Sequence, residues 1–326
     1  MLRPFLFLAV SLAAVFACKA GAQQPDPALD IYARPGRLVN IGHDRHLNLR
    51  CSGKGSPTVI LESGNNADSM TWFKVQPEIA KFTQVCSYDR AGTGFSDGGP
   101  LPRDVDTHAD DLAALIHAAG IATPVVLVGH SYGTNIVRRF ADRHARDVAA
   151  LVLLDPPPQN VGEFSPEFAK ADQDEHRRML AAIRHCATGA DAGKLDTPEF
   201  TGCLRPANPQ FSAALNAAMH ASKVRPAFWQ TMISITQTNA DLYRQSVSKS
   251  ETHGATPLLI LQPDAPFEDV PPAFRKAMEQ ARTKTQRAIA ATSTRGRIVP
   301  VAHSSHDVQM DRPDAVIDAV RTLVRP

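Results

Sequence analysis

A serine enclosed by two glycines is the feature that most constrains this chain: the stretch VGHSYG places Ser131 between Gly129 and Gly133. It follows the apolar run PVVLV and precedes the helical pattern TNIVRRFADRHA, so the serine lies where a strand passes into a helix. A turn this sharp leaves little room for side chains two positions before and after its central residue, which favours glycine at both. The pattern therefore predicts a nucleophilic serine at the end of a sheet, beside a helix N-terminus that favours negative charge. An ordinary turn that carries the pattern by chance is the alternative.

Apolar strand-like runs alternate with amphipathic helical patterns along most of the chain. The runs are TQVCSYD, PVVLVG, ALVLLD, TPLLILQ and GRIVPVA, and the helical patterns include DTHADDLAALIHAA and DAVIDAVRTLV. Strands this apolar are buried on both faces, and their alternation with helices predicts an α/β fold with a mostly parallel sheet flanked by helices. Before this region, LVNI, HLNLR and TVILE predict a meander of strands that ends at Leu61.

The alternation stops between residues 156 and 256, where the sequence shows only helical patterns and loops. A segment of this length without strands is unusual as a loop, so we expect an inserted helical cap. The predicted organisation is a signal peptide over 1–22, a first part of the core over 23–155, the cap over 156–256 and a second part of the core over 257–326. The stretch PDPALDIYARPG is expected to be a short linker.

The N-terminus has the pattern of a secretory signal peptide. Arg3 precedes an apolar run, and Ala20-Gly21-Ala22 matches a cleavage site of small residues. The run is shorter than the roughly 20 residues that a membrane span needs. Lipidation at Cys18 is a less favoured alternative, because Phe16 fits such a site poorly. We therefore predict a periplasmic or secreted protein whose mature chain has no integral membrane span.

Four cysteines remain after the predicted cleavage, and an even number in an oxidising compartment favours disulfides. Cys51 and Cys86 lie on or beside neighbouring predicted strands, whereas Cys186 and Cys203 lie close together in the helical segment. These placements predict the two bridges Cys51–Cys86 and Cys186–Cys203. The sequence has no C-x-x-C motif and no His/Cys ligand spacing, so no structural metal is expected.

The net charge of +2 is too small to indicate a nucleic-acid partner, and no basic stripe interleaved with aromatic residues appears.

A serine nucleophile also needs a base, which in turn needs an orienting carboxylate. The loop between the last strand and the last helix contains SSHD, and we predict that His306 is the base, with His303 as the alternative. The two histidines lack a carboxylate-rich partner segment, which argues against a metal site.

Together these segments resemble the α/β-hydrolase superfamily, and specifically bacterial exported serine hydrolases and esterases with a helical cap. The matching runs are LESGNNADSMTWFKVQPEIA, CSYDRAGTGFSD, LVGHSYG, LVLLDPPP and SSHDVQMDRPDAVIDAV. The resemblance implies that Ser131 is the nucleophile and His306 the base. It also implies that the backbone amides of Asn65 and Tyr132 form the oxyanion hole, although Ser63 stands where the family has histidine.

Two aspartates are candidates for the triad acid. Asp155 ends the strand ALVLLD, and Asp264 follows the strand LLILQP. The family more often places the acid after the later strand, but this chain resembles a subgroup with the acid one strand earlier. Asp264 also lies in a proline-flanked turn, where aspartate has a plain structural role. We favour Asp155.

The sequence thus predicts a serine hydrolase that cleaves a small-molecule carboxylic ester through an acyl-enzyme on Ser131, with no cofactor and no metal. Amidase, lactonase, peptidase and cofactor-free haloperoxidase activities on the same triad remain alternatives. A non-catalytic binding protein on a hydrolase scaffold is the alternative from another class, because a fold alone does not determine a function.

Overall fold

A computed structural model of the chain describes residues 26–267 and 270–324. The predicted signal peptide over 1–22 and the alternative lipidation site at Cys18 lie outside the described residues. Within the described ranges, no helix is both long and apolar enough to cross a membrane.

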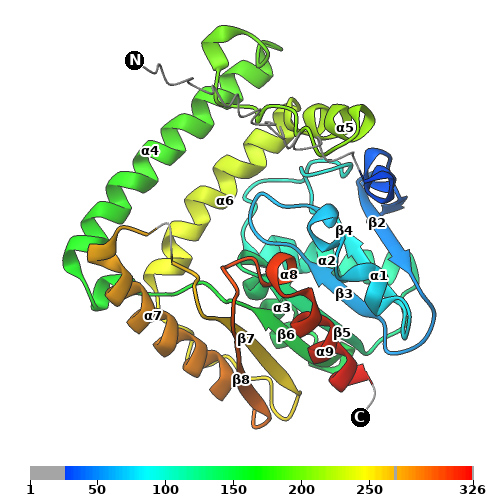
Figure 1. The fold of residues 1–326 in the computed structure, drawn as a ribbon, viewed down its shortest axis with the longest axis vertical. Helices are drawn as coiled ribbons and strands as arrows, with labels where there is room; N and C mark the ends of the chain where they lie inside the picture. The colour runs from blue at the N-terminus through cyan, green and yellow to red at the C-terminus, as the bar shows by residue number, and fades with distance from the viewer. Residues whose placement is uncertain (1–25, 268–269, 325–326) are drawn as a thin grey trace, which may run out of the picture.

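An eight-stranded sheet forms the centre of the molecule (Figure 1). Its spatial order is β1-β2-β4-β3-β5-β6-β7-β8, and every neighbouring pair from β4 to β8 is parallel. The strands are β1 (Arg37–Asn40), β2 (His46–Ser52), β3 (Val59–Glu62), β4 (Val85–Tyr88), β5 (Val125–His130), β6 (Val148–Leu154), β7 (Leu258–Pro263) and β8 (Gly296–Val301). The prediction of an α/β fold with a mostly parallel sheet is confirmed.

The predicted meander is wrong in its third strand. β1 and β2 form an antiparallel pair, but β3 lies between β4 and β5 and pairs with both in parallel. β4 separates it from β2, with which β4 pairs antiparallel. All four residues of β3 are buried, which is typical of a central parallel strand rather than of a meander with one solvated face.

Helices cover both faces of the sheet. On one face α2 (Val105–Ala119) and α3 (Tyr132–Arg143) pack against the strands, and on the other face α1 (Gln76–Ile79) and α9 (Pro313–Val324) do so. α2 begins with a capping box between Asp104 and Thr107 and ends at Gly120. That glycine has φ +70°, the left-handed conformation that closes a helix without a Cβ clash.

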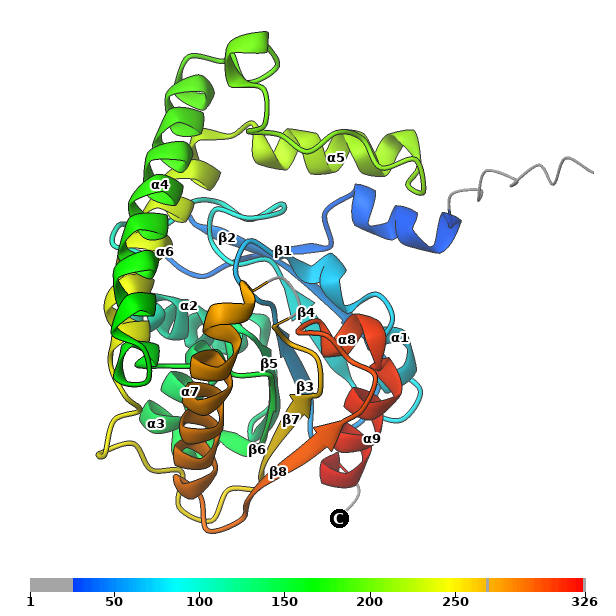
Figure 2. The same ribbon diagram turned by 60° about the vertical axis from the view of Figure 1, so that its left-hand side comes forward.

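The segment between β6 and β7 contains three long helices and no strand within the described residues. These are α4 (Pro166–Asp191), α5 (Ala213–Lys223) and α6 (Pro226–Arg244). α4 and α6 run side by side, and α5 crosses the end of the molecule nearest to η1 (Figures 1 and 2). Phe228, Trp229 and Met232 of α6 pack with buried residues of α4 in a separate apolar cluster.

Both predicted disulfides are present. Cys51 and Cys86 face each other across the β2–β4 pair, and Cys186 joins Cys203 within the helical segment. The second bridge closes a loop with a sequence separation of 17 residues, which contributes about 3 kcal/mol in the chain-entropy model.

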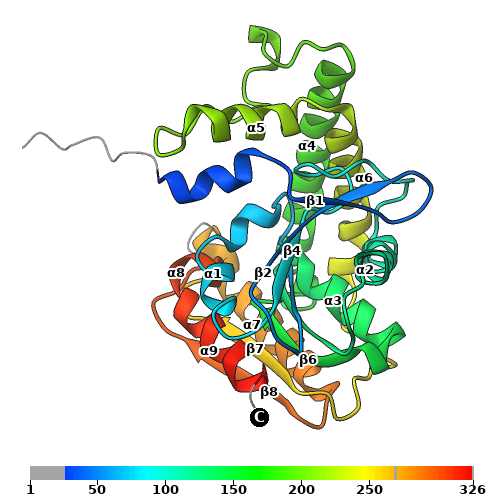
Figure 3. The same ribbon diagram turned by 90° about the vertical axis from the view of Figure 1, so that its right-hand side faces the viewer.

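The expected linker after the signal peptide is instead a 3₁₀ helix, η1 (Pro27–Ala33). The Asp26 side chain accepts a hydrogen bond from the Ala28 N–H and caps its first turn. Leu29 and Tyr32 lie three residues apart on one side and pack against Leu215 of α5. The ribbons of this 3₁₀ helix and of α5 lie side by side in Figures 2 and 3. The segment therefore belongs to the folded molecule.

Candidate active site

Ser131 lies in a strained turn between β5 and α3. Its φ of 50° and ψ of −123° fall outside the regions that non-glycine residues normally adopt. A Cβ on Gly129 would come within 2.8 Å of the Gly133 carbonyl oxygen, and a Cβ on Gly133 would come within 2.5 Å of the Ser63 carbonyl oxygen. The fold therefore requires glycine at both positions around the serine.

Asp155 and His306 are hydrogen-bonded, with 2.7 Å between Asp155 Oδ2 and His306 Nδ1. Asp155 directly follows β6, the strand next to β5, and is 3% exposed. His306 lies in the loop between β8 and the short helix α8 (Val308–Asp311). Because the carboxyl ends of these parallel strands share one edge of the sheet, Ser131, Asp155 and His306 gather there.

The environment of His306 favours its protonated form. Partial burial lowers the pKa of His306, but the hydrogen bond and the charge of Asp155, together with Asp307, outweigh burial and raise it above its usual value. The Nδ1 atom faces the carboxylate and so carries the proton in the neutral ring, which leaves the lone pair on Nε2. Among the described residues Ser131 Oγ makes no hydrogen bond, and catalytic contacts of this kind often tighten only when substrate binds.

Two residues of α7 (Pro272–Ala291) contact Asp155 and were not foreseen from the sequence. Gln286 Nε2 donates to Asp155 Oδ1 at 3.2 Å, and Arg282 Nη1 lies 3.8 Å from the same oxygen. Both side chains are buried. They satisfy the carboxylate oxygen that His306 does not use, so Asp155 is fixed on both sides.

The alternative acid and base occupy different places. Asp264 accepts hydrogen bonds from the backbone N–H groups of His303 and Ser304, and these bonds lower its pKa. Within the described residues, no hydrogen bond joins Asp264 to His306. His303 is exposed and has φ 58°. Asp264 thus connects the loop after β7 to the loop after β8 through these two hydrogen bonds.

The two expected oxyanion amides lie on either side of the serine. A Cβ on Gly64, which precedes Asn65, would be 3.4 Å from Ser131 Cβ, so this turn runs against Ser131. Tyr132 is the first residue of α3, where a backbone N–H has no partner inside the helix. In the part of the chain that the structure describes, neither the Asn65 nor the Tyr132 N–H donates to a protein acceptor.

His130, directly before Ser131, is buried and contacts the loop that carries His306. Its Nε2 atom lies 3.0 Å from the His306 carbonyl oxygen, and the two rings are 4.8 Å apart between centroids. Burial, followed by the nearby His306, lowers the pKa of His130 to about 4. The ring is therefore neutral near pH 7 and donates its Nε2 proton to that carbonyl.

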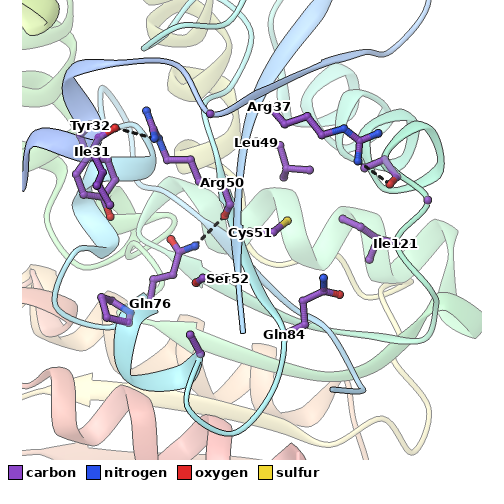
Figure 4. Close-up of a pocket in the computed structure, with 15 residues that line it drawn as sticks. Ile31, Tyr32, Arg37, Leu49, Arg50, Cys51, Ser52, Gln76, Gln84 and Ile121 are labelled. Atoms are coloured by element: carbon purple, nitrogen blue, oxygen red, sulfur yellow. Dashed lines mark hydrogen bonds between the residues drawn. The ribbon is translucent and has the colours of Figure 1, made fainter. Parts of the chain in front are cut away.

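Within the described residues, no group of three or more His, Cys, Asp or Glu side chains could hold a metal ion. A cavity of about 620 Å³ lies at the outer part of the sheet beside Cys51, as Figure 4 shows. Tyr32, Arg50 and Gln76 are among its lining residues, and none of the described candidate catalytic residues is. This cavity is separate from the site around Ser131.

Comparison with known proteins agrees with this fold. A family model described as alpha/beta hydrolase fold matches residues 57–258. The uncharacterized protein YqjL of Bacillus subtilis is 29% identical over 133 residues, which cover 41% of this chain and 53% of YqjL. The chain spans about half the length, or less, of the first curated relatives that it matches.

Solved structures show the same fold over nearly the whole chain. A thermophilic esterase from Thermogutta terrifontis superposes with a TM-score of 0.60 at 20% identity and covers 90% of this chain and 98% of its own. The esterase EaEST from Exiguobacterium antarcticum has a TM-score of 0.60 at 15% identity and covers 89% of this chain and 100% of its own.

Proposed function

Because this chain belongs to the alpha/beta hydrolase fold family, we propose that it is a serine hydrolase that cleaves carboxylic esters through an acyl-enzyme on Ser131. The observation that carries the proposal is the 2.7 Å hydrogen bond between Asp155 and His306 at the sheet edge where Ser131 lies in its strained turn. An imidazole oriented by a carboxylate, at the sheet edge that also carries the serine, is the arrangement expected to activate that serine.

In the first half of the proposed reaction, His306 Nε2 takes the hydroxyl proton while Ser131 Oγ attacks the ester carbonyl carbon. The carbonyl oxygen becomes negative and receives hydrogen bonds from the Asn65 and Tyr132 amides, each worth about 3 kcal/mol in related sites. His306 then gives its proton to the leaving alcohol. Asp155 stabilises the imidazolium in between, without accepting its proton.

In the second half, water replaces the alcohol. His306 takes a proton from the water, the resulting hydroxide attacks the acyl carbon, and the carboxylic acid leaves as Ser131 regains its proton. No group outside the protein and the two substrates, ester and water, is needed to balance these steps.

We also propose that residues 156–256 act as a cap on this site. Among the contacts that link the segment to the core, Ser234 Oγ accepts a hydrogen bond from the Arg103 N–H at 2.6 Å, and Lys223 Nζ donates to Asn66 Oδ1 at 2.8 Å. Asn66 directly follows Asn65. The second contact therefore brings the end of α5 to the turn that carries one proposed oxyanion amide.

Export is part of the proposal, on the strength of the two disulfides. Disulfides persist in oxidising compartments such as the periplasm and are rare in a reducing cytosol. Both pairs are bonded in this fold. The proposed location is therefore periplasmic or secreted.

A fluorophosphonate probe tests the nucleophile directly. We expect it to label the purified protein at Ser131, and we expect p-nitrophenyl esters of short to long acyl chains to be hydrolysed, with the cap deciding which length is fastest. Peptide mass spectrometry locates the label, and release of p-nitrophenol measures turnover. A protein that is neither labelled nor active would be a binding protein, whereas labelling with turnover only of amides or lactones would change the substrate class.

The pH dependence follows from the raised pKa of His306. Only the neutral ring can accept the serine proton, so kcat/KM should rise with pH through that pKa, and the acid limb should lie above the usual value of about 6.5. His130, with its pKa near 4, stays neutral across this range and contributes no limb. The measurement is kcat/KM for a p-nitrophenyl ester between pH 5 and 9. An acid limb centred below pH 6 would contradict the assignment.

A further inference from the structure

A buried arginine outside the triad holds the turn that carries Asn65. Arg90 lies just after β4, is 2% exposed, and reaches across to the end of the neighbouring strand β3. Its Nη1 atom donates to the Ser63 carbonyl oxygen at 2.6 Å, and its Nη2 atom donates to the Gly64 carbonyl oxygen.

The guanidinium is itself fixed by a buried carboxylate. Arg90 Nη1 also donates to Glu62 Oε1 at 2.5 Å, and the Tyr88 hydroxyl donates to the other oxygen of Glu62. Burial lowers the pKa of Arg90, but Glu62 and Tyr88 outweigh burial and raise it, so the group is a cation at every working pH. The guanidinium also lies 5.7 Å from the centre of the Tyr132 ring.

Peptide geometry links these bonds to the reaction. The Gly64–Asn65 peptide is trans, and in a trans peptide the carbonyl and the N–H of one unit point in opposite directions. An arginine that binds the Gly64 oxygen therefore turns the Asn65 N–H away from itself. A charge-assisted hydrogen bond on the carbonyl also polarises the peptide and strengthens its N–H as a donor.

We propose that Arg90 is a positioning residue that aims the Asn65 N–H at the developing oxyanion and strengthens it as a donor. The inference rests on the proposed function, because it presupposes that this amide binds the oxyanion. Lysine could not replace arginine here, because only a planar fork reaches two carbonyl oxygens and a carboxylate at once.

The test compares two buried ion pairs. The double variant Glu62→Gln/Arg90→Met removes both charges, so that no unpaired charge stays buried. The matched control is Glu251→Gln/Arg138→Met: Arg138 of α3 and Glu251, in the loop between α6 and β7, also form a largely buried ion pair, at 2.5 Å, and neither residue has a hydrogen bond to the Ser63–Asn65 turn among the described residues. Circular dichroism establishes that each variant is folded.

Two readouts separate aiming from mere stability. One is kcat and KM for a p-nitrophenyl ester, and the other is Ki for a trifluoromethyl ketone, whose adduct with Ser131 carries a negative oxygen. In the double variant we expect kcat to fall and Ki to rise by roughly 10²-fold, the cost of one oxyanion donor, with KM changed less than about threefold. The control should change none of the three by more than about threefold.

Unchanged kcat and Ki in the folded double variant would overturn the inference, as would an equal loss in the control. If the double variant does not fold, Arg90→Lys decides by the same thresholds, because it keeps the charge but not the fork. A wild-type protein that is neither labelled by fluorophosphonate nor active on esters would instead refute the proposed function. If the wild-type protein is active and the variant without Arg90 keeps that activity, the inference fails and the proposed function stands.

Discussion

Replacing Ser131 with alanine is expected to lower ester turnover by roughly 10⁴- to 10⁶-fold, because no other group in the proposed site can form the acyl-enzyme. His306→Ala should cost about as much, since residues that act as one unit lose activity together rather than additively. The measurement is the single-turnover rate on a p-nitrophenyl ester, with fluorophosphonate labelling as a second readout that both variants should lose.

Two neighbouring substitutions serve as matched controls. Ser305→Ala removes a hydroxyl that donates to Asp311 Oδ2 at 2.6 Å, close to His306 in the same loop, and should keep most of the activity. His303→Ala removes an exposed ring and should also keep it. Loss of activity in His303→Ala with retention in His306→Ala would move the role of the base to His303. Turnover retained in Ser131→Ala would refute the acyl-enzyme mechanism.

The strands that are apolar on both faces could be predicted from the sequence, but the order of the strands in the sheet could not. Hydrophobic patterns report burial along the chain, but they carry little information about which strand lies beside which. The sequence of β3 shows this limit, because VILE follows the β1–β2 pair in the chain and yet packs between β4 and β5. Strands that are consecutive in the sequence often lie side by side in a sheet, but here β4 lies between β2 and β3.

The polar contacts around Asp155 and the Ser63–Asn65 turn were missed from the sequence. α7 reads PAFRKAMEQARTKTQRAIAA, and nothing in this sequence indicates which strand end its polar side chains face. It nevertheless supplies Arg282 and Gln286 to Asp155. Similarly, Arg90 lies in the stretch DRAGTG, where the glycines indicate a turn and nothing indicates what the arginine binds. Contacts between distant polar residues depend on tertiary structure, which no local pattern encodes.

The proposed nucleophile has a clearer signal in the sequence than the proposed acid, for a physical reason. The strained turn at Ser131 imposes glycines two positions away on both sides, and these can be read from the sequence. An acid needs only a place at a strand end and a histidine within reach, and both Asp155 and Asp264 follow strands. Geometry separates them: Asp155 bonds to the His306 ring, whereas Asp264 bonds to backbone N–H groups.

The second large effect is therefore expected at Asp155. In Asp155→Asn the side-chain amide can donate to His306 Nδ1. This favours the tautomer that carries its proton on Nε2, and a protonated Nε2 cannot accept the serine proton. We expect turnover to fall by roughly 10⁴-fold with the fold retained, because Asn Oδ1 can still accept from Gln286. The measurement is kcat/KM for a p-nitrophenyl ester, with the melting temperature as the check on folding.

Asp264→Asn is the matched substitution, since it makes the same chemical change one strand further along the sheet. Its amide oxygen keeps one of the two hydrogen bonds to the His303 and Ser304 N–H groups, so the loop loses about one bond, and activity should fall by roughly fivefold or less. The opposite pattern, a large loss in Asp264→Asn and a small one in Asp155→Asn, would make Asp264 the acid. It would also require His306 to leave its 2.7 Å contact with Asp155 during turnover, because one ring nitrogen cannot be oriented by both carboxylates at once.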